Sequence, residues 1–244
     1  MTASRPPRSR SGPGPGRLRA VVTDVDGTLT DARRRLDPRA LDWVHRLETR
    51  GFPVVLATGN VLPIALALHR FLGLSGPIVA ENGGIVYSRA SGSDWVEQLA
   101  DRRVAERGYR RLRRAGLPVR RLFTDRWRES EVALEPTVAV AKIRAALGRL
   151  PLTVESTGFA IHLMEAGAGK RPALERALAP LGVGIEECVV LGDGDNDVEM
   201  LSAAGFGVSF PSGSARARAA ARFVTRARFG RGFVEGLKES RILG

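Results

Sequence analysis

The chain has 244 residues, of which 43% are hydrophobic, enough to fill one large α/β domain or a core domain with a smaller companion. Its single cysteine, Cys188, cannot form an internal disulfide, which argues against a disulfide-rich extracellular scaffold. No run of about 18 apolar residues is present, and no apolar block follows the basic N-terminal residues, so neither a membrane span nor a secretory signal is expected. We therefore expect a cytoplasmic protein without membrane contact.

The formal net charge of +12 comes from two segments. Residues 1–16 carry three arginines and no acidic residue, and residues 102–128 carry eleven arginines against two acidic residues. The second segment fits a solvated helix face, an electrostatic funnel for phosphorylated substrates or a nucleic-acid surface. The nearby Tyr109 and Trp127 are too few to suggest a base-stacking platform, so we favour the solvated face and do not expect a nucleic-acid partner.

The first half of the chain alternates between predicted strands and helices. Residues 1–16, rich in Pro, Gly, Ser and Arg, predict a disordered tail. After it, Asp37 and Pro38 are typical of a helix start and Gly51 of a helix end. Strands are expected at residues 18–25, 53–57 and 77–80, and helices at residues 38–50 and 62–72. This alternation predicts a Rossmann-like parallel sheet with right-handed crossovers.

After Gly83 and Gly84 the alternation is interrupted. Residues 94–115 resemble one long Arg-rich helix, and a second helix is expected at residues 136–150. Short strands are expected at residues 119–123, 131–134, 152–155 and 159–164, the last two joined by a tight turn at Thr157-Gly158. The alternation resumes with a helix over residues 169–181, a strand over 188–191 and a helix over 198–203. We therefore predict a core of residues 17–85 and 164–244 with an inserted smaller α/β domain at 86–163.

The sequence Asp24-Val25-Asp26-Gly27-Thr28 closes the first predicted strand, at the sheet edge where open parallel sheets bind ligands. A carboxylate can attack phosphorus and form an aspartyl phosphate, and a second carboxyl group can protonate the leaving oxygen and then activate water. A D-G-T sequence by itself also fits a loop or a helix cap. The pair Asp24 and Asp26 is therefore a candidate nucleophile with its acid/base partner.

A second acidic sequence, Gly192-Asp193-Gly194-Asp195-Asn196-Asp197, follows another buried strand and leads into a helix. Asp193 and Asp197 are four residues apart and could hold Mg2+ at the strand-to-helix junction. The spacing of acids partly resembles a calcium loop, but Val198 and Ala204 stand where such a loop needs glycine and glutamate. A magnesium site is therefore favoured.

Two further features suit phosphoryl transfer. Thr58-Gly59-Asn60 closes the second strand, where a hydroxyl and a backbone N–H can hold phosphate oxygens. Lys170 stands at the start of the helix after the insertion and can balance charge as the transition state forms. Each feature alone also fits an ordinary turn or a solvated lysine.

Taken together and in this order, the four motifs resemble the haloacid dehalogenase superfamily of Mg2+-dependent phosphotransferases. The insertion after the third strand resembles the branch with a C2-type α/β cap, and within it the archaeal phosphoglycolate phosphatases. The resemblance implies that Asp24 is the nucleophile and a Mg2+ ligand, and that Asp26 is the general acid/base whose carbonyl also binds the metal. Gly194 departs from the pattern of many close relatives, which have serine there, although glycine is common across the wider superfamily.

The resemblance assigns the remaining site residues as follows. Thr58, Gly59 and Lys170 would hold the transferring phosphoryl group, Asp193 and Asp197 would complete the metal site, and Asn196 would orient Lys170 or the phosphate. It implies hydrolysis of a small phosphorylated metabolite, foremost 2-phosphoglycolate to glycolate and phosphate. The alternatives are another sugar or sugar-acid phosphatase, a phosphomutase, or a nucleic-acid-binding protein on the same scaffold.

The sequence alone leaves three points open. His162 could contact substrate or be structural, because its predicted strand lies close to the hinge before Lys170. Glu81 and Asn82 could belong to the site or fix the hinge loop. The oligomeric state is open between a monomer and a homodimer.

Overall fold

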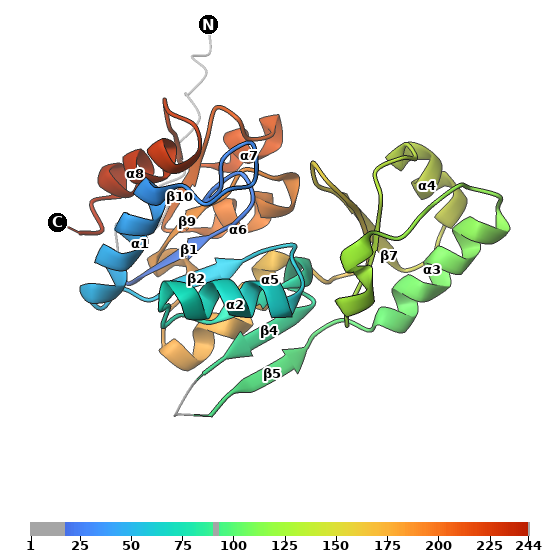
Figure 1. Ribbon diagram of the computed structural model, residues 1–244, viewed down its shortest axis with the longest axis horizontal. Helices are drawn as coiled ribbons and strands as arrows, with labels where there is room; N and C mark the ends of the chain where they lie inside the picture. The colour runs from blue at the N-terminus through green and yellow to red at the C-terminus, as the bar shows by residue number, and fades with distance from the viewer. Residues whose placement is uncertain (1–17, 90–92, 244) are drawn as a thin grey trace, which may run out of the picture.

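The computed structural model describes residues 18–89 and 93–243, so the predicted tail at residues 1–16 lies outside the described residues. The larger part of the chain forms an eight-stranded sheet (Figure 1), parallel from β11 to β3 and antiparallel at β4 and β5. In spatial order its strands are β11 (Phe223–Val224), β10 (Phe206–Ser209), β9 (Cys188–Leu191), β1 (Ala20–Thr23), β2 (Val54–Ala57), β3 (Ile78–Ala80), β4 (Ile85–Ser88) and β5 (Trp95–Gln98).

Strand β1 lies in the middle of this sheet and is buried on both faces. Val21 pairs with Val54 of β2 and with Val189 of β9, so β1 has a parallel neighbour on each side. The side chain of Val21 packs into one hydrophobic cluster, whereas Ala20 and Val22 pack into the cluster on the opposite face. A strand covered on both faces needs a continuous apolar run, which is why this strand is visible in the sequence.

Helices cover both faces of the large sheet, which gives three layers. One face carries α1 (Pro38–Thr49), α2 (Leu62–Leu72) and α8 (Phe229–Ser240). The other face carries α5 (Lys170–Leu178), α6 (Val198–Ala203) and α7 (Ala215–Ala220). Helix α1 begins as predicted, because the Asp37 side chain accepts a hydrogen bond from the backbone N–H of Arg39. The predicted Rossmann-like α/β class is confirmed.

The smaller unit, residues 102–165, is called the cap below and lies beside the large sheet (Figure 1). Its three antiparallel strands are, in spatial order, β6 (Val132–Leu134), β8 (Ile161–Glu165) and β7 (Leu152–Ser156). Helices α3 (Arg102–Arg114) and α4 (Val140–Leu147) pack on this sheet through Leu112 and Ile143. The predicted small antiparallel sheet with two helices is therefore present.

The predicted start of the insertion at residue 86 and the predicted start of the Arg-rich helix at residue 94 are wrong. Strands β4 and β5 form a hairpin that extends the large sheet, and the register pairs Tyr87 with Val96. Helix α3 starts only at Arg102, where Asp101 accepts a hydrogen bond from the N–H of Arg103. The cap therefore begins after β5.

A smaller difference concerns the predicted strand at residues 119–123. That segment makes only an isolated bridge from Arg121 to Leu134, and a 3-10 turn (Phe123–Trp127) follows it.

The backbone on the core side of the cap is tightly packed. Gly83 has φ +101°, and a side chain there would collide with the carbonyl oxygen of Gly169, just before Lys170. The close approach fixes the position of the chain where it returns from the cap to the core.

In the part of the chain that the structure describes, no helix combines the length and apolar character needed to cross a membrane. The cytoplasmic location and the oligomeric state stay predictions.

Candidate active site

The predicted motifs meet at the carboxyl edge of the large sheet. Asp24 directly follows β1, and its backbone N–H donates to the carbonyl oxygen of Leu191, the last residue of β9, at 2.9 Å. Gly27 turns the chain back with φ +83°, and a side chain there would collide with the carboxylate of Asp193. Thr58 follows β2 at the same edge. The first two acidic motifs are therefore brought together from opposite ends of the chain.

Lys170 joins two of the predicted acidic residues. Its ammonium donates to Asp24 Oδ1 at 2.7 Å and to Asp197 Oδ1 at 2.6 Å, and all three side chains are buried. Burial alone would lower the pKa of Lys170, but the two carboxylates outweigh it and raise the pKa. The lysine is therefore held as a cation beside Asp24, whose Oδ2 accepts no hydrogen bond from the described residues.

Asp24, Asp193 and Asp197 form the only group of acidic, cysteine or histidine ligands in the described residues that could hold a metal ion. Their carboxylate oxygens lie within 4.8 Å of one another. Burial, reinforced by the charge of Asp197, raises the pKa of Asp193 to about 7. Burial also raises the pKa of Asp24, against the opposing effect of Lys170. Three carboxylates beside one ammonium leave an excess of negative charge, and a hard divalent cation with a preference for oxygen ligands would balance it.

Asp197 differs from the other two members of this group. Its Oδ1 accepts from Lys170, and its Oδ2 accepts the backbone N–H of Asp193 at 3.0 Å and of Gly194 at 2.8 Å. Both carboxylate oxygens are therefore already engaged in positioning the lysine and the loop that carries Asp193.

The Asp26 carboxylate is held by two residues. Its Oδ1 accepts from Nε of Arg34 at 2.9 Å, and its Oδ2 accepts from Nδ2 of Asn60 at 2.7 Å. Asn60 lies in the predicted Thr58-Gly59-Asn60 motif, although no role follows for it from the sequence. Arg34 is not among the site residues predicted from the sequence.

The predicted phosphate-binding residues lie beside this centre. The Thr58 hydroxyl oxygen accepts from the backbone N–H of Asn60 at 3.1 Å, which keeps its own proton free to donate. Asn196 makes no hydrogen bond to Lys170 among the described residues. Instead its Nδ2 donates to Oδ1 of Asn82 at 2.9 Å. Asn196 lines the cavity and is linked to the core–cap junction, whereas Thr58 is buried next to the lining residue Gly59.

A buried polar network crosses that junction. Asn82 donates to Oε2 of Glu131 at 3.1 Å, and Glu131 also pairs with Arg128 and with Nδ1 of His162. Glu81 accepts the backbone N–H groups of two cap residues and the hydroxyl of Ser130. Thus Glu81 and Asn82 fix the junction. His162 is fully buried and does not line the cavity, so of its two possible roles, substrate contact and structure, the structural one fits.

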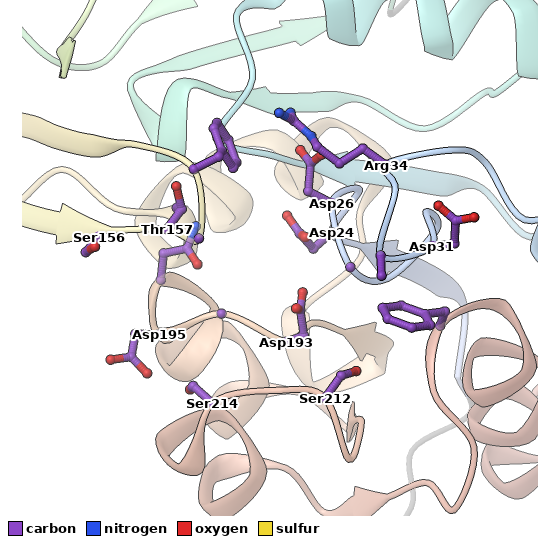
Figure 2. A pocket seen from close by; sticks show the side chains of 18 residues that line it. Asp24, Asp26, Asp31, Arg34, Ser156, Thr157, Asp193, Asp195, Ser212 and Ser214 are labelled. Atoms are coloured by element: carbon purple, nitrogen blue, oxygen red, sulfur yellow. The ribbon is translucent and has the colours of Figure 1, made fainter. Parts of the chain in front are cut away.

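A cavity of about 600 Å³ lies above the acidic group, between the core and the cap. Figure 2 shows Asp24 and Asp26 on one side of it, Asp193 facing them and Arg34 over Asp26. The cap contributes residues 156–159, which include the predicted turn at Thr157-Gly158. The cavity therefore brings a candidate nucleophile, acid/base, phosphate loop and cation site to one solvent-accessible space.

A family model described as haloacid dehalogenase-like hydrolase matches residues 21–125 and 134–235. The chain belongs to this family. Phosphoglycolate phosphatase of Methanothermobacter thermautotrophicus is 38% identical over 222 residues, which covers 91% of this chain and 98% of that protein. Phosphoglycolate phosphatase of Methanoculleus marisnigri is 36% identical and covers 91% of this chain and 96% of its own. These findings confirm the resemblance and the predicted enzyme class, a phosphoric monoester hydrolase.

Solved structures agree with the fold. The protein 0175 of Thermoplasma acidophilum is 25% identical and superposes with a TM-score of 0.84 over 93% of this chain and 100% of that one. The sugar phosphatase BT4131 superposes with a TM-score of 0.74 over 92% of this chain and 99% of its own, at 17% identity. The latter likeness supports the core-and-cap fold alone.

Proposed function

We propose that this chain hydrolyses 2-phosphoglycolate to glycolate and inorganic phosphate, with Mg2+, through a phosphoenzyme on Asp24. One observation carries the mechanism. Lys170 holds one oxygen of Asp24 at 2.7 Å, the other oxygen accepts no hydrogen bond from the described residues, and Asp24 lines the cavity. The substrate is inferred from the names of the relatives that match nearly the whole chain.

In the first step, Asp24 Oδ2 attacks the phosphorus atom while the bond from phosphorus to the ester oxygen breaks. Asp26 donates its proton to the departing oxygen, so glycolate leaves as an alcohol rather than as an alkoxide. Lys170 and the Thr58 hydroxyl stabilise the negative charge on the phosphoryl oxygens. Arg34 and the Asn60 amide position the Asp26 carboxylate, each donating to one of its oxygens. For the acid step, one of these oxygens must exchange its N–H donor for the proton that it passes to the leaving group.

In the second step, water attacks the phosphorus of the aspartyl phosphate. Asp26, now ionised, accepts a proton from that water, the bond from phosphorus to Asp24 breaks, and phosphate is released. Both carboxyl groups return to their starting state, so the cycle balances.

The residues that would hold Mg2+ are Asp24, the backbone carbonyl of Asp26, and Asp193. The excess negative charge of the acidic group and the raised pKa of Asp193 fit a divalent cation. When bound, the ion would neutralise charge between the nucleophile and the phosphoryl oxygens. Since both oxygens of Asp197 are engaged, we propose that Asp197 positions Lys170 and the Asp193 loop rather than binding the ion directly.

Phosphate release with Mg2+ should be measured across 2-phosphoglycolate, sugar phosphates, mannosyl-3-phosphoglycerate and a mononucleotide. Asp24→Asn should abolish release, and the exposed Asp42→Asn in α1 should leave it unchanged. A strong preference for 2-phosphoglycolate is expected. Preference for another ester would overturn the substrate and keep the chemistry, and an isomeric sugar phosphate without free phosphate would indicate a mutase. Full activity of Asp24→Asn would overturn the mechanism.

A further inference from the structure

The loop of residues 31–35, which follows the first acidic motif, directs the side chain of Arg34 into the cavity. The carboxylate of Asp31 accepts the backbone N–H groups of Arg33 at 2.8 Å and Arg35 at 3.0 Å, and its side chain also pairs with Arg35. Between them, Arg34 adopts φ +60°, a left-handed conformation that non-glycine residues seldom take. The two hydrogen bonds to Asp31 hold the backbone on both sides of Arg34, and the Arg34 side chain lines the cavity.

The Arg34 guanidinium is only partly used by the protein. Its Nε donates to Asp26 Oδ1 at 2.9 Å, and its Cζ lies over the Phe159 ring of the cap, 4.3 Å from the ring centre. The two terminal amino groups donate to no acceptor in the described residues, and the side chain is 53% exposed. The planar group is thus fixed at one edge and one face while its terminal N–H groups remain available to a ligand.

The charge of the cavity makes this arginine distinctive. The lining includes five aspartates, whereas Arg34 is the one cationic side chain among the described lining residues. The phosphoryl group has its own partners in Lys170 and the proposed metal ion. A second anionic group on the substrate could therefore find a positive partner in the cavity wall only at Arg34.

Position relates this cation to the leaving group. In the proposed mechanism Asp26 protonates the ester oxygen, so the leaving group must lie next to Asp26 and hence next to Arg34. In 2-phosphoglycolate a single methylene separates the ester oxygen from the carboxylate, so that carboxylate cannot lie far from Asp26. A planar guanidinium is well suited to bind a planar carboxylate through paired hydrogen bonds.

We propose that Arg34 determines substrate class by binding the carboxylate of the leaving group, while Phe159 of the cap stacks on the guanidinium. The preferred substrates are then phosphate monoesters of small 2-hydroxy acids. This inference rests on the proposed function, because it takes the position of the leaving group from the role of Asp26.

The test compares two esters of nearly equal size on the full chain with Mg2+. 2-Phosphoglycolate carries the carboxylate, and 2-hydroxyethyl phosphate replaces it with a neutral alcohol. Arg34→Gln should lower kcat/KM for 2-phosphoglycolate about 10- to 100-fold, mainly through KM, and for the alcohol ester much less. Arg34→Lys should recover part of the loss, because it restores the charge without the planar fork. Arg33→Gln, one residue away with the same change of charge and outside the lining, should match the wild type on both esters.

The outcomes separate the two proposals. An equal fall on both esters would show that Arg34 acts only through Asp26 and would overturn the carboxylate role alone. The wild-type protein could instead hydrolyse the alcohol ester or sugar phosphates but not 2-phosphoglycolate. That result would overturn both the proposed substrate and this inference. If the melting curve shows that Arg34→Gln is unfolded, Arg34→Lys and Phe159→Leu take its place. The quantity measured is then the ratio of kcat/KM for 2-phosphoglycolate to kcat/KM for 2-hydroxyethyl phosphate. An unchanged ratio in both variants would overturn the inference.

Discussion

The guanidinium of Arg128 donates a hydrogen bond of 3.0 Å to the carbonyl oxygen of Gly59, so a cap residue holds the proposed phosphate loop of the core. Arg128 also pairs with Glu131, which shares a hydrogen bond of 2.9 Å with His162. The other ring nitrogen of His162 lies 3.3 Å from the hydroxyl of Thr157, which lines the cavity. A chain of polar contacts, buried except at Thr157, thus joins the phosphate loop to the cap turn.

Breaking this chain should cost both stability and activity. Arg128→Met leaves Glu131 buried beside fewer positive partners, which should lower the free energy of unfolding by about 3–5 kcal/mol. It also removes the donor to Gly59, so kcat should fall. Denaturant unfolding and steady-state kinetics measure the two effects. Arg113→Met, an exposed arginine of α3, is the matched control and should change stability by less than about 0.5 kcal/mol. Equal stability of the two variants would contradict the assignment of a structural charge network.

Lys170 should be indispensable for turnover. Lys170→Met removes the ammonium that donates to both Asp24 and Asp197, so kcat should fall by about 100- to 1000-fold with the metal present. Lys170→Arg should not restore activity, because the larger planar group does not fit a buried site made for an ammonium. The exposed Lys142→Met of α4 serves as the control. A Lys170→Met enzyme within tenfold of the wild type would argue against a role in phosphoryl transfer.

The stability of the metal-free protein should depend on pH through the carboxyl group of Asp193. Folding raises the pKa of this group from 3.8 to about 7, through burial and the charge of Asp197. Between these values the folded state binds more protons than the unfolded chain, so the contribution of Asp193 to stability falls as the pH rises. In EDTA, the melting temperature of Asp193→Asn minus that of the wild type should therefore increase from about pH 4 to about pH 7. The exposed Asp42→Asn is measured in parallel as the control. A difference for Asp193→Asn that does not change with pH would contradict the raised pKa of Asp193.

The close approach at Gly83 should make any side chain there costly. Gly83→Ala has two sources of strain, φ +101° and a collision with the carbonyl oxygen of Gly169 that cannot be relieved without moving Lys170. Gly51→Ala is the matched control, because Gly51 has φ +80° with no atom within 4 Å of the added carbon. The control should lose about 1–2 kcal/mol of stability and keep its kcat. Gly83→Ala should lose more stability and also activity, and equal effects in both variants would show that the backbone angle alone matters.

The part of the site at the strand ends is predictable from the sequence. Asp24, Thr58 and Asp193 each follow an apolar run directly, or by two residues, and the ends of parallel strands converge at one edge of the sheet. Their proximity follows from topology. Nothing more than strand order and direction is needed to bring these three residues together.

The residues that reach the cavity from loops or from the cap are not predictable in the same way. Residues 33–35 are three arginines in a row, and only the backbone angle of Arg34 decides which of them faces the cavity. Arg128 lies in an Arg-rich segment whose composition also fits a solvated surface, and its burial depends on how the cap docks on the core. The Asp31 side chain was an available signal, because an aspartate before a polar run is typical of a side-chain-stabilised turn.

The hairpin of β4 and β5 could not be predicted from the sequence for a related reason. Local composition around residues 94–115 favours a helix, since arginine and alanine are good helix formers. Trp95 and Val96 become a strand because β4 offers an edge with which to pair. Pairing between strands is a tertiary effect that overrides local propensity.

The central place of β1, between β2 and β9, bears on the order in which the chain acquires structure. β1 ends at Thr23, whereas its neighbour β9 starts at Cys188, so the large sheet cannot close until most of the chain has been synthesised. The cap draws all its strands and helices from residues 102–165, and contacts between segments close in sequence form faster. We therefore expect the cap to fold first, with amides of β7 and β8 gaining protection in pulsed hydrogen exchange before those of β1. Simultaneous protection would show that the two units fold as one.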